Sequence, residues 1–268
     1  MKNNYHTHTF RCHHANGTDE EYVKAAIAGG YQILGFSDHA PWQYRNPQFV
    51  PRIRMPLSEF VDYYESINRL KIKYADQITI KIGLETEYFP QYMDWMQKFA
   101  QDQQLDYLIF GNHFVGSDEN GVYYGYECDD DEILVQYQDD VLAGLKTGLY
   151  SCLAHPDLFM RGRMRFDKLC EQVSYQICEA AKATNTPLEY NLAGMQVSDM
   201  MHIVQYPYPA FWEIAAKVGN QVIIGCDAHD PSALSNPYYY DKALKELATL
   251  GLQRIDSLDI TKFKKKVD

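Results

Sequence analysis

The sequence contains no stretch of about 18 consecutive apolar residues, the length that a membrane-spanning helix requires. Its first residues, MKNNY, also lack the apolar core of a signal peptide. The six cysteines include no Cys-x-x-Cys pair, which argues against a disulfide framework and against a zinc site built from four thiolates. We therefore expect a cytoplasmic protein with reduced, mostly buried thiols and no membrane partner.

Basic residues are also scarce, since 25 Lys and Arg face 36 Asp and Glu, for a formal net charge of −11. A protein that follows the phosphates of a nucleic acid presents a basic stripe. The only dense basic run is KFKKK at residues 262–266, which we interpret as a solvated tail. The charge balance argues against a nucleic-acid partner and favours a small-molecule ligand.

No linker-like segment, internal repeat or low-complexity tract divides the 268 residues. With 46 % apolar and 14 % aromatic residues, a chain of this length can bury one large core. The stretches without clear periodicity, at residues 40–57 and 114–130, are of the size of loops. Residues 1–268 are therefore predicted to form a single domain.

Short apolar runs that end in polar residues alternate with amphipathic segments of helical length, as is typical of βα units around a parallel sheet. Seven strands are predicted at residues 4–8, 33–37, 78–84, 107–111, 150–154, 187–191 and 221–225. Helices are predicted at residues 19–29, 58–74, 91–101, 132–147, 166–184, 209–218 and 240–250.

Both faces of an all-parallel sheet must be covered, and such a regular unit order closes readily into a barrel. We expect an α/β fold, namely a distorted (β/α)7 barrel of the TIM-barrel type, with a doubly wound open sheet as the alternative. Thr18 and Glu21 match a capping box at the start of the first helix, and Gly29-Gly30 suits its end. Ser58 is predicted to cap the second helix.

Histidines and carboxylates gather at the C-terminal ends of the predicted strands, where βα barrels carry their reactive residues. His6 and His8 point the same way, because residues i and i+2 of a strand share a face. Of the adjacent Asp38 and His39, we take His39 as the inward group and Asp38 as a partner that fixes a ring tautomer. The candidate donors are His6, His8, one of His13 and His14, His39, Glu85, His113, His155, Asp227 and His229.

Nine donors suffice for about three metal ions, because a catalytic zinc site takes about three protein ligands. Imidazole and carboxylate suit Zn²⁺, Fe, Mn²⁺ or Co²⁺. Glu85 or Asp227 is suited to bridge two ions, because a carboxylate has two oxygens. Two ions about 3.5–4 Å apart can activate water and clamp a phosphoryl oxygen, so the donors predict phosphate-ester hydrolysis. His202 lies away from any strand end and is left out of the site.

The motifs occur in a characteristic order along the chain: HTHT (6–9), CHH (12–14), SDHAP (37–41), GLETEY (83–88), GNHF (111–114), AHPD (154–157) and CDAHD (226–230). This ordered set resembles that of the PHP (polymerase and histidinol phosphatase) phosphoesterases, in particular the monofunctional histidinol-phosphate phosphatases. The resemblance covers essentially the whole chain. It implies a distorted (β/α)7 barrel with three divalent metal ions.

The resemblance also implies residue roles, with His14 rather than His13 as the loop donor. It places His6, His8, Glu85 and Asp227 around one ion, His113, His155 and the bridging Glu85 around a second, and His14, His39 and His229 around a third. It implies that a metal-bridging hydroxide hydrolyses L-histidinol phosphate in histidine biosynthesis, with Asp227 as proton acceptor. The alternatives are a PHP phosphatase or phosphodiesterase for another small phosphoester or nucleotide, and a metal-binding module without catalysis.

The segment after the fifth predicted strand carries arginines, whose planar fork can hold two phosphate oxygens. Arg161 and Arg163 are predicted to bind substrate, Arg161 being nearer the strand end; exposed arginines at a helix start are the alternative. Asn191 is predicted to line the pocket, with loop capping as its alternative. Trp42 and Tyr44 either stack on the imidazole of the substrate or pack over the barrel edge.

Overall fold

The strands follow the predicted order in the computed structural model, which describes residues 1–264. One parallel sheet has the order β1-β2-β3-β4, formed by Asn3–Asn4 (β1), Ile33–Phe36 (β2), Thr79–Thr86 (β3) and Tyr107–Phe110 (β4). A second parallel sheet has the order β5-β6-β7, formed by Leu188–Asn191 (β5), Gln221–Gly225 (β6) and Gln253–Arg254 (β7). The short β7 was not predicted.

The predicted fifth strand, residues 150–154, lies between the two sheets without forming a continuous strand. Leu153 pairs in parallel with Phe110 at the end of β4 and with Leu188 at the start of β5. The amide of Ala154 donates to the carbonyl of Phe110 at 2.8 Å. The segment therefore occupies a strand position and joins the two sheets.

A further bridge closes the ring. Thr7, beyond β1, pairs in parallel with Ala228, beyond β6. Within residues 1–264, the barrel thus has seven strand positions: β1, β2, β3, β4, the segment 150–154, β5 and β6. The fold is the expected distorted (β/α)7 barrel, and the alternative of an open sheet is wrong.

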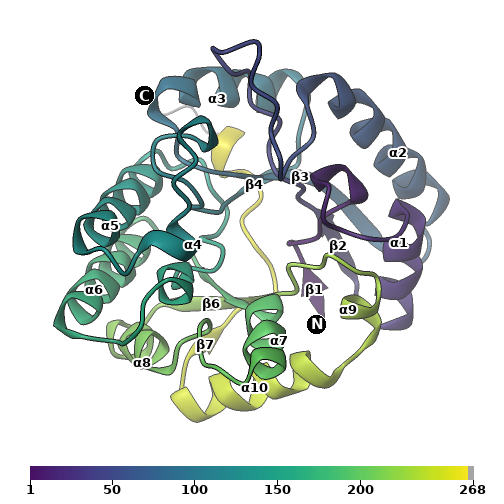
Figure 1. Ribbon diagram of the computed structural model, residues 1–268. Coiled ribbons are helices and arrows are strands. Elements are labelled where there is room, and N and C mark those ends of the chain that lie inside the picture. Colours follow the sequence, from purple (N-terminus) through teal and green to yellow (C-terminus); the bar gives the residue numbers. More distant parts are fainter. Residues whose placement is uncertain (265–268) are drawn as a thin grey trace.

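Helices surround the barrel (Figure 1). Those that match the seven predicted helices are Asp19–Ala28 (α1), Phe60–Lys73 (α2), Met93–Asp102 (α3), Asp131–Lys146 (α5), Lys168–Ala183 (α6), Pro209–Val218 (α8) and Tyr238–Leu250 (α10). The unpredicted helices are Tyr124–Glu127 (α4), Leu192–Met201 (α7) and Ser232–Ser235 (α9). Within residues 1–264, no helix combines the length and the apolar character needed to cross a bilayer.

Local sequence signals account for the ends of α1. The hydroxyl of Thr18 accepts from the amide of Glu21, whose carboxylate accepts from the amide of Thr18, so the predicted capping box is confirmed. Gly30, just past the helix, has φ of +75°, a conformation that glycine adopts without strain. The prediction for Ser58 is wrong, because Leu57–Glu59 forms a 3-10 turn and α2 follows without a side-chain cap.

The chain after β7 fills the N-terminal end of the barrel. In Figure 1 this yellow segment passes through the middle of the ring. Leu258 is buried there against a small core that includes Tyr107 and Ile223. The side-chain amide of Asn3 donates to the carbonyl of Asp256 at 2.7 Å and holds the segment in place. The barrel is therefore plugged at the end opposite to the histidines.

The basic run at 262–266 is only partly described, since residues 265 and 266 lie outside the described part of the chain. Lys262 Nζ donates to the carbonyls of Thr184 at 3.3 Å and Asn185 at 2.7 Å. Phe263 is fully buried. The prediction of a solvated tail is therefore wrong for the start of this run, which packs onto the barrel.

Candidate active site

The side chains predicted to bind metal converge at the C-terminal rim of the barrel. They lie at the end of β1 (His6, His8), after the 3-10 turn Phe10–Cys12 (His14), after β2 (His39), in β3 (Glu85), after β4 (His113), after segment 150–154 (His155) and after β6 (Asp227, His229). They meet because parallel strands present their C-terminal ends at one edge. Most are buried, whereas His14 and His229 reach the opening.

Two imidazole nitrogens, of His6 and His8, each lie close to one oxygen of Glu85 and one oxygen of Asp227. Nε2 of His6 lies 3.1 Å from Nε2 of His8, 3.5 Å from Oε2 of Glu85 and 3.4 Å from Oδ1 of Asp227. Nε2 of His8 lies 3.5 Å from the same Glu85 oxygen and 3.2 Å from the same Asp227 oxygen. Ligands bound tetrahedrally at about 2.0–2.1 Å from Zn²⁺ are about 3.3 Å apart. These spacings therefore fit a zinc-sized ion.

The second oxygen of Glu85 faces a different group. Oε1 lies 2.8 Å from Nε2 of His155 and 3.4 Å from Nε2 of His113. The rings of His113 and His155 lie side by side, with centroids 5.0 Å apart. One carboxylate thus touches both groups of imidazoles, which is the geometry that a bridging ligand needs.

A third group lies nearest the opening. Nε2 of His14 and Nε2 of His229 are 3.0 Å apart. Together with His39, they offer ligand atoms that lie within 4.8 Å of one another. His13 instead ends the preceding turn with φ of 68° and is exposed. The structure therefore brings His14, and not His13, to the cluster.

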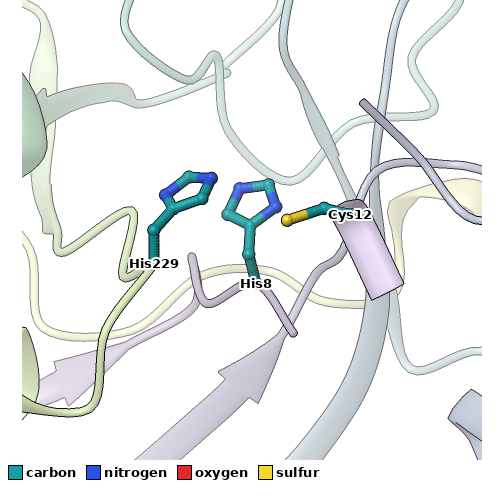
Figure 2. Close-up of side chains that lie close together, drawn as sticks. All are labelled: His8, Cys12 and His229. Carbon is teal, nitrogen blue, oxygen red and sulfur yellow. The ribbon is translucent and has the colours of Figure 1, made fainter. Parts of the chain in front are cut away.

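Cys12 is a neighbour of these groups that sequence reasoning missed. Figure 2 shows the ring of His8 between the ring of His229 and the sulfur of Cys12. Burial alone would raise the pKa of the Cys12 thiol, but hydrogen bonds with His14, His229 and His8 lower the pKa to about 5. All six cysteines are free and buried, as predicted. The motif CHH was the available signal, because it places this thiol two residues before a donor.

Buried carboxylates hold the outer nitrogen of two donor rings. Oε1 of Glu189 lies 2.7 Å from Nδ1 of His6, and Oε1 of Glu87 lies 3.0 Å from Nδ1 of His113. A carboxylate in this position fixes the tautomer and leaves Nε2 free for a metal. Sequence reasoning missed both, although Glu87 shares a strand face with Glu85 by the same i, i+2 rule that linked His6 and His8.

Asp38 was predicted to fix a ring tautomer, and it faces His8 rather than its neighbour in the sequence. Its Oδ1 lies 3.4 Å from Nδ1 of His8 and accepts from the amide of His39 at 2.8 Å. Its Oδ2 accepts from the amide and the hydroxyl of Thr9. Asp38 therefore ties the ends of β1 and β2 together beneath the cluster.

The cluster sets the charge of its own members. Burial alone would raise the pKa of Glu85, but surrounding imidazoles, of which His113 acts most strongly, hold the pKa well below its usual range. Burial likewise opposes ionisation of Asp227, and His6 with its neighbours holds that pKa well below its usual range. Burial keeps the pKa of His39 well below its usual value. The ionised carboxylates and the neutral ring of His39 are thus in forms that bind cations. Burial would lower the pKa of His6 and His8, but the neighbouring carboxylates raise both well above the usual value, so a metal must displace protons there.

A cavity of about 750 Å³ opens over the donors. This volume lies within the usual range for small-molecule sites. Arg161 lines the cavity, and its guanidinium donates to the hydroxyls of Tyr123 at 3.4 Å and Tyr126 at 3.1 Å. Tyr206 forms part of another wall, where its ring lies edge-on to His155. The cavity thus combines the donors with one cation and several aromatic rings.

The structure does not bring Arg163 to this cavity, contrary to prediction. Its guanidinium donates to the carbonyl of Cys128 at 3.2 Å and pairs with Asp131 at 2.8 Å and Asp167 at 2.5 Å. These partners hold Arg163 at the start of α6, as the alternative expected, but its side chain is only 5 % exposed, so the expected exposure is wrong. Two arginines only two residues apart therefore have different surroundings.

Asn191, Trp42 and Tyr44 do not line the cavity and instead take the structural roles that were the alternatives for them. The side-chain oxygen of Asn191 caps α7, and its amide donates to Glu189 at 2.9 Å and Asp227 at 3.1 Å, so the residue is buried below the cavity. Trp42 and Tyr44 do not line the cavity and instead pack against the barrel edge. His202, which was left out of the site, ends α7 and is exposed.

The sequence is similar to known proteins over most of its length. The model of the PHP domain family matches residues 4–193. A protein of Deinococcus radiodurans named "Probable histidinol-phosphatase" is 27 % identical over 265 residues, which are 92 % of each chain. A "Histidinol-phosphatase" of Lactococcus lactis subsp. lactis is 25 % identical over 200 residues, which are 71 % of each chain.

The fold is also similar to that of a solved structure. The histidinol phosphate phosphatase of Lactococcus lactis, in complex with zinc, L-histidinol and phosphate, superposes with a TM-score of 0.74. The match covers 96 % of this chain and 98 % of that chain, at 19 % sequence identity. The two chains therefore share one architecture, from the first strand to the C-terminal region.

Proposed function

The chain belongs to the PHP domain family, and from this premise we propose that it is a metal-dependent phosphatase that hydrolyses L-histidinol phosphate to L-histidinol and phosphate in histidine biosynthesis. The observation that carries the proposal is the position of Glu85 between two groups of imidazoles. Relatives named histidinol-phosphatase, similar over most of their length, support the substrate. The cytoplasmic location expected from the sequence stays a prediction.

We assign three divalent ions to the cluster, with Zn²⁺, Fe and Mn²⁺ as candidates. The first would be held by His6, His8, Glu85 and Asp227, the second by Glu85, His113 and His155, and the third by His14, His39 and His229. The spacings around His6 and His8 support the first assignment, because each is close to the separation of two ligands on a zinc-sized ion. The presence of zinc in the Lactococcus lactis structure supports the choice of metals.

Bound divalent ions supply an activated water nucleophile at neutral pH and neutralise the charge of the phosphoryl oxygens. Asp227 accepts the proton of the nucleophile, since its carboxylate lines the cavity floor. The amide of Asn191 donates to Oδ2 of Asp227 at 3.1 Å and keeps that carboxylate in one orientation. Arg161 binds the phosphate, because its guanidinium lines the cavity, where it donates to the hydroxyls of Tyr123 and Tyr126.

Phosphate release by metal-loaded protein tests this proposal. L-histidinol phosphate is compared with sugar phosphates, nucleotides and a single-stranded oligonucleotide, and elemental analysis counts the bound ions. We expect the fastest release from L-histidinol phosphate. Faster release from a nucleotide or another phosphoester would favour the alternative PHP activity, and no release from any of them would leave a metal-binding module without catalysis.

A further inference from the structure

Arg54 is a fully buried guanidinium outside the cavity. Its Nη2 lies 2.6 Å and its Nη1 3.0 Å from the two oxygens of Glu87. Its Nε donates to Asp118 at 2.9 Å, and Nη1 also donates to the carbonyl of Ala40 at 3.2 Å. A buried ion pair of this kind is weak evidence for stability, because desolvation offsets much of the attraction. Its position therefore calls for another explanation.

Glu87 connects this guanidinium to the cluster. Its Oε1, which Arg54 contacts, lies 3.0 Å from Nδ1 of His113, while Oε2 accepts from Nε1 of Trp42 at 3.0 Å. Each carboxylate oxygen therefore has two partners, and the carboxylate is held in one orientation. The chain Arg54, Glu87, His113 runs from the loop after β2 to the edge of the second metal group.

The carboxylate decides which nitrogen of His113 carries hydrogen. With Nδ1–H donated to Glu87, the lone pair of Nε2 points toward Oε1 of Glu85, 3.4 Å away. Among the described residues, Nδ1 of His155 has no hydrogen-bond partner. In the second group, therefore, a carboxylate within residues 1–264 holds the outer nitrogen Nδ1 of His113 but not that of His155.

The same guanidinium also joins three segments of the rim. Ala40 lies after β2, Glu87 lies directly after β3, and Asp118 begins the 3-10 turn Asp118–Asn120 beyond His113. Asp118 additionally accepts from the hydroxyl of Tyr44 at 2.7 Å. Removing the charge of Arg54 would release the loop that carries His113 as well as the carboxylate that orients its ring.

We propose that Glu87 and Arg54 are positioning residues that hold His113 for metal binding, so that they set the affinity of the second metal position. This inference rests on the metal centre of the proposed function. Loss of an outer partner of a metal-binding histidine typically weakens metal affinity about 10- to 100-fold. The effect should be confined to one of the three ions, since Glu87 touches the ring of one proposed ligand.

The test titrates metal-free protein with Zn²⁺ against a competing chelator, together with elemental analysis. Glu87→Gln should bind one ion about 10- to 100-fold more weakly and the others as in the wild type. Glu87→Asp keeps the charge but withdraws the oxygens, and should weaken the same ion. Asp140→Asn is the matched control, because Asp140 is a buried carboxyl that pairs with Tyr124 at 2.5 Å and with no histidine.

A triple variant separates positioning from folding. Glu87→Gln leaves the buried charge of Arg54 with one carboxylate, which should lower the melting temperature. Arg54→Met with Glu87→Gln and Asp118→Asn removes all three charges of this group and should recover much of that loss, while the weakened ion stays weak. Recovery of metal affinity together with the melting temperature would show that the pair serves the fold alone, and would overturn the proposal.

Two further outcomes are distinguishable. If the wild type binds its ions and both Glu87→Gln and Glu87→Asp bind every ion within twofold of it, the positioning role is overturned and the proposed function stands. If the wild type binds no divalent metal, the proposed function fails and this inference fails with it.

Discussion

Oε1 of Glu85 lies 2.8 Å from Nε2 of His155, although 70 residues separate the two in the chain. The strand position that carries His155 is not adjacent to β3, because β4 lies between them. The contact therefore passes over the C-terminal end of β4. The contact places His155 and His113 next to His6 and His8, because the other oxygen of Glu85 faces those two rings.

Glu85→Gln should abolish most of the activity. The substitution keeps the shape but removes the negative charge that faces both groups of imidazoles. We expect the rate of phosphate release to fall by more than about 100-fold, because losing a proposed metal ligand should cost more than losing a residue that only orients a ligand. The metal content should fall as well. Elemental analysis and the phosphate assay measure both, and a variant with near-normal turnover would remove Glu85 from the centre.

Arg161→Met should raise KM for L-histidinol phosphate by roughly 10- to 100-fold. A lost hydrogen bond to a charged group costs about 1.5–3 kcal/mol, which corresponds to a change of this size in affinity. Arg163→Met is the matched control, since that guanidinium pairs with Asp131 and Asp167 outside the cavity. The control should keep its KM and lose some thermal stability. Equal KM values for the two variants would contradict the assignment of Arg161.

Leu258→Ala should destabilise the barrel through its plugged end. Leu258 is buried in the small core at the N-terminal end of the barrel strands. Its truncation would leave a cavity there, which should lower the free energy of unfolding by about 2–5 kcal/mol. Ile72→Ala on the exposed face of α2, where the side chain is 72 % exposed, should change it by less than about 0.5 kcal/mol. Urea unfolding measures both, and similar small values would contradict the plug.

Asp140→Asn should change how stability depends on pH. Burial raises the pKa of Asp140 in the folded protein above its usual value. Its contribution to stability is therefore complete below the unfolded pKa of about 3.9 and is lost as pH rises through the folded pKa. Asparagine stays neutral throughout, so the variant should gain melting temperature relative to the wild type as pH rises from about 4 to about 8.

Thermal melts of both proteins, recorded with a chelator present, provide the comparison. The chelator removes the pH dependence of metal binding from the difference between the two proteins. A difference in melting temperature that stays constant over this range, or one that reverses, would contradict the raised pKa of Asp140.

Several features of the site were predictable because they depend on short stretches of chain. Alternation along a strand places His6 and His8 on one face, and the common edge of parallel strands brings His113 and His155 to the same rim. The same alternation along a strand could have predicted that Glu87 lies on the same face as Glu85. Arg54 was not predictable, because nothing in its own segment indicates that a distant carboxylate neutralises it.

By itself, the sequence determined the alternation of strands and helices and the chemical types of residue at each strand end, because both depend on neighbours a few residues apart. Only the tertiary structure shows that Arg163 lies outside the cavity, and that Leu258 packs into the N-terminal end of the barrel. It also decided which imidazole each oxygen of Glu85 meets. These outcomes depend on the twist and register of strands far apart in the chain, which no local pattern encodes.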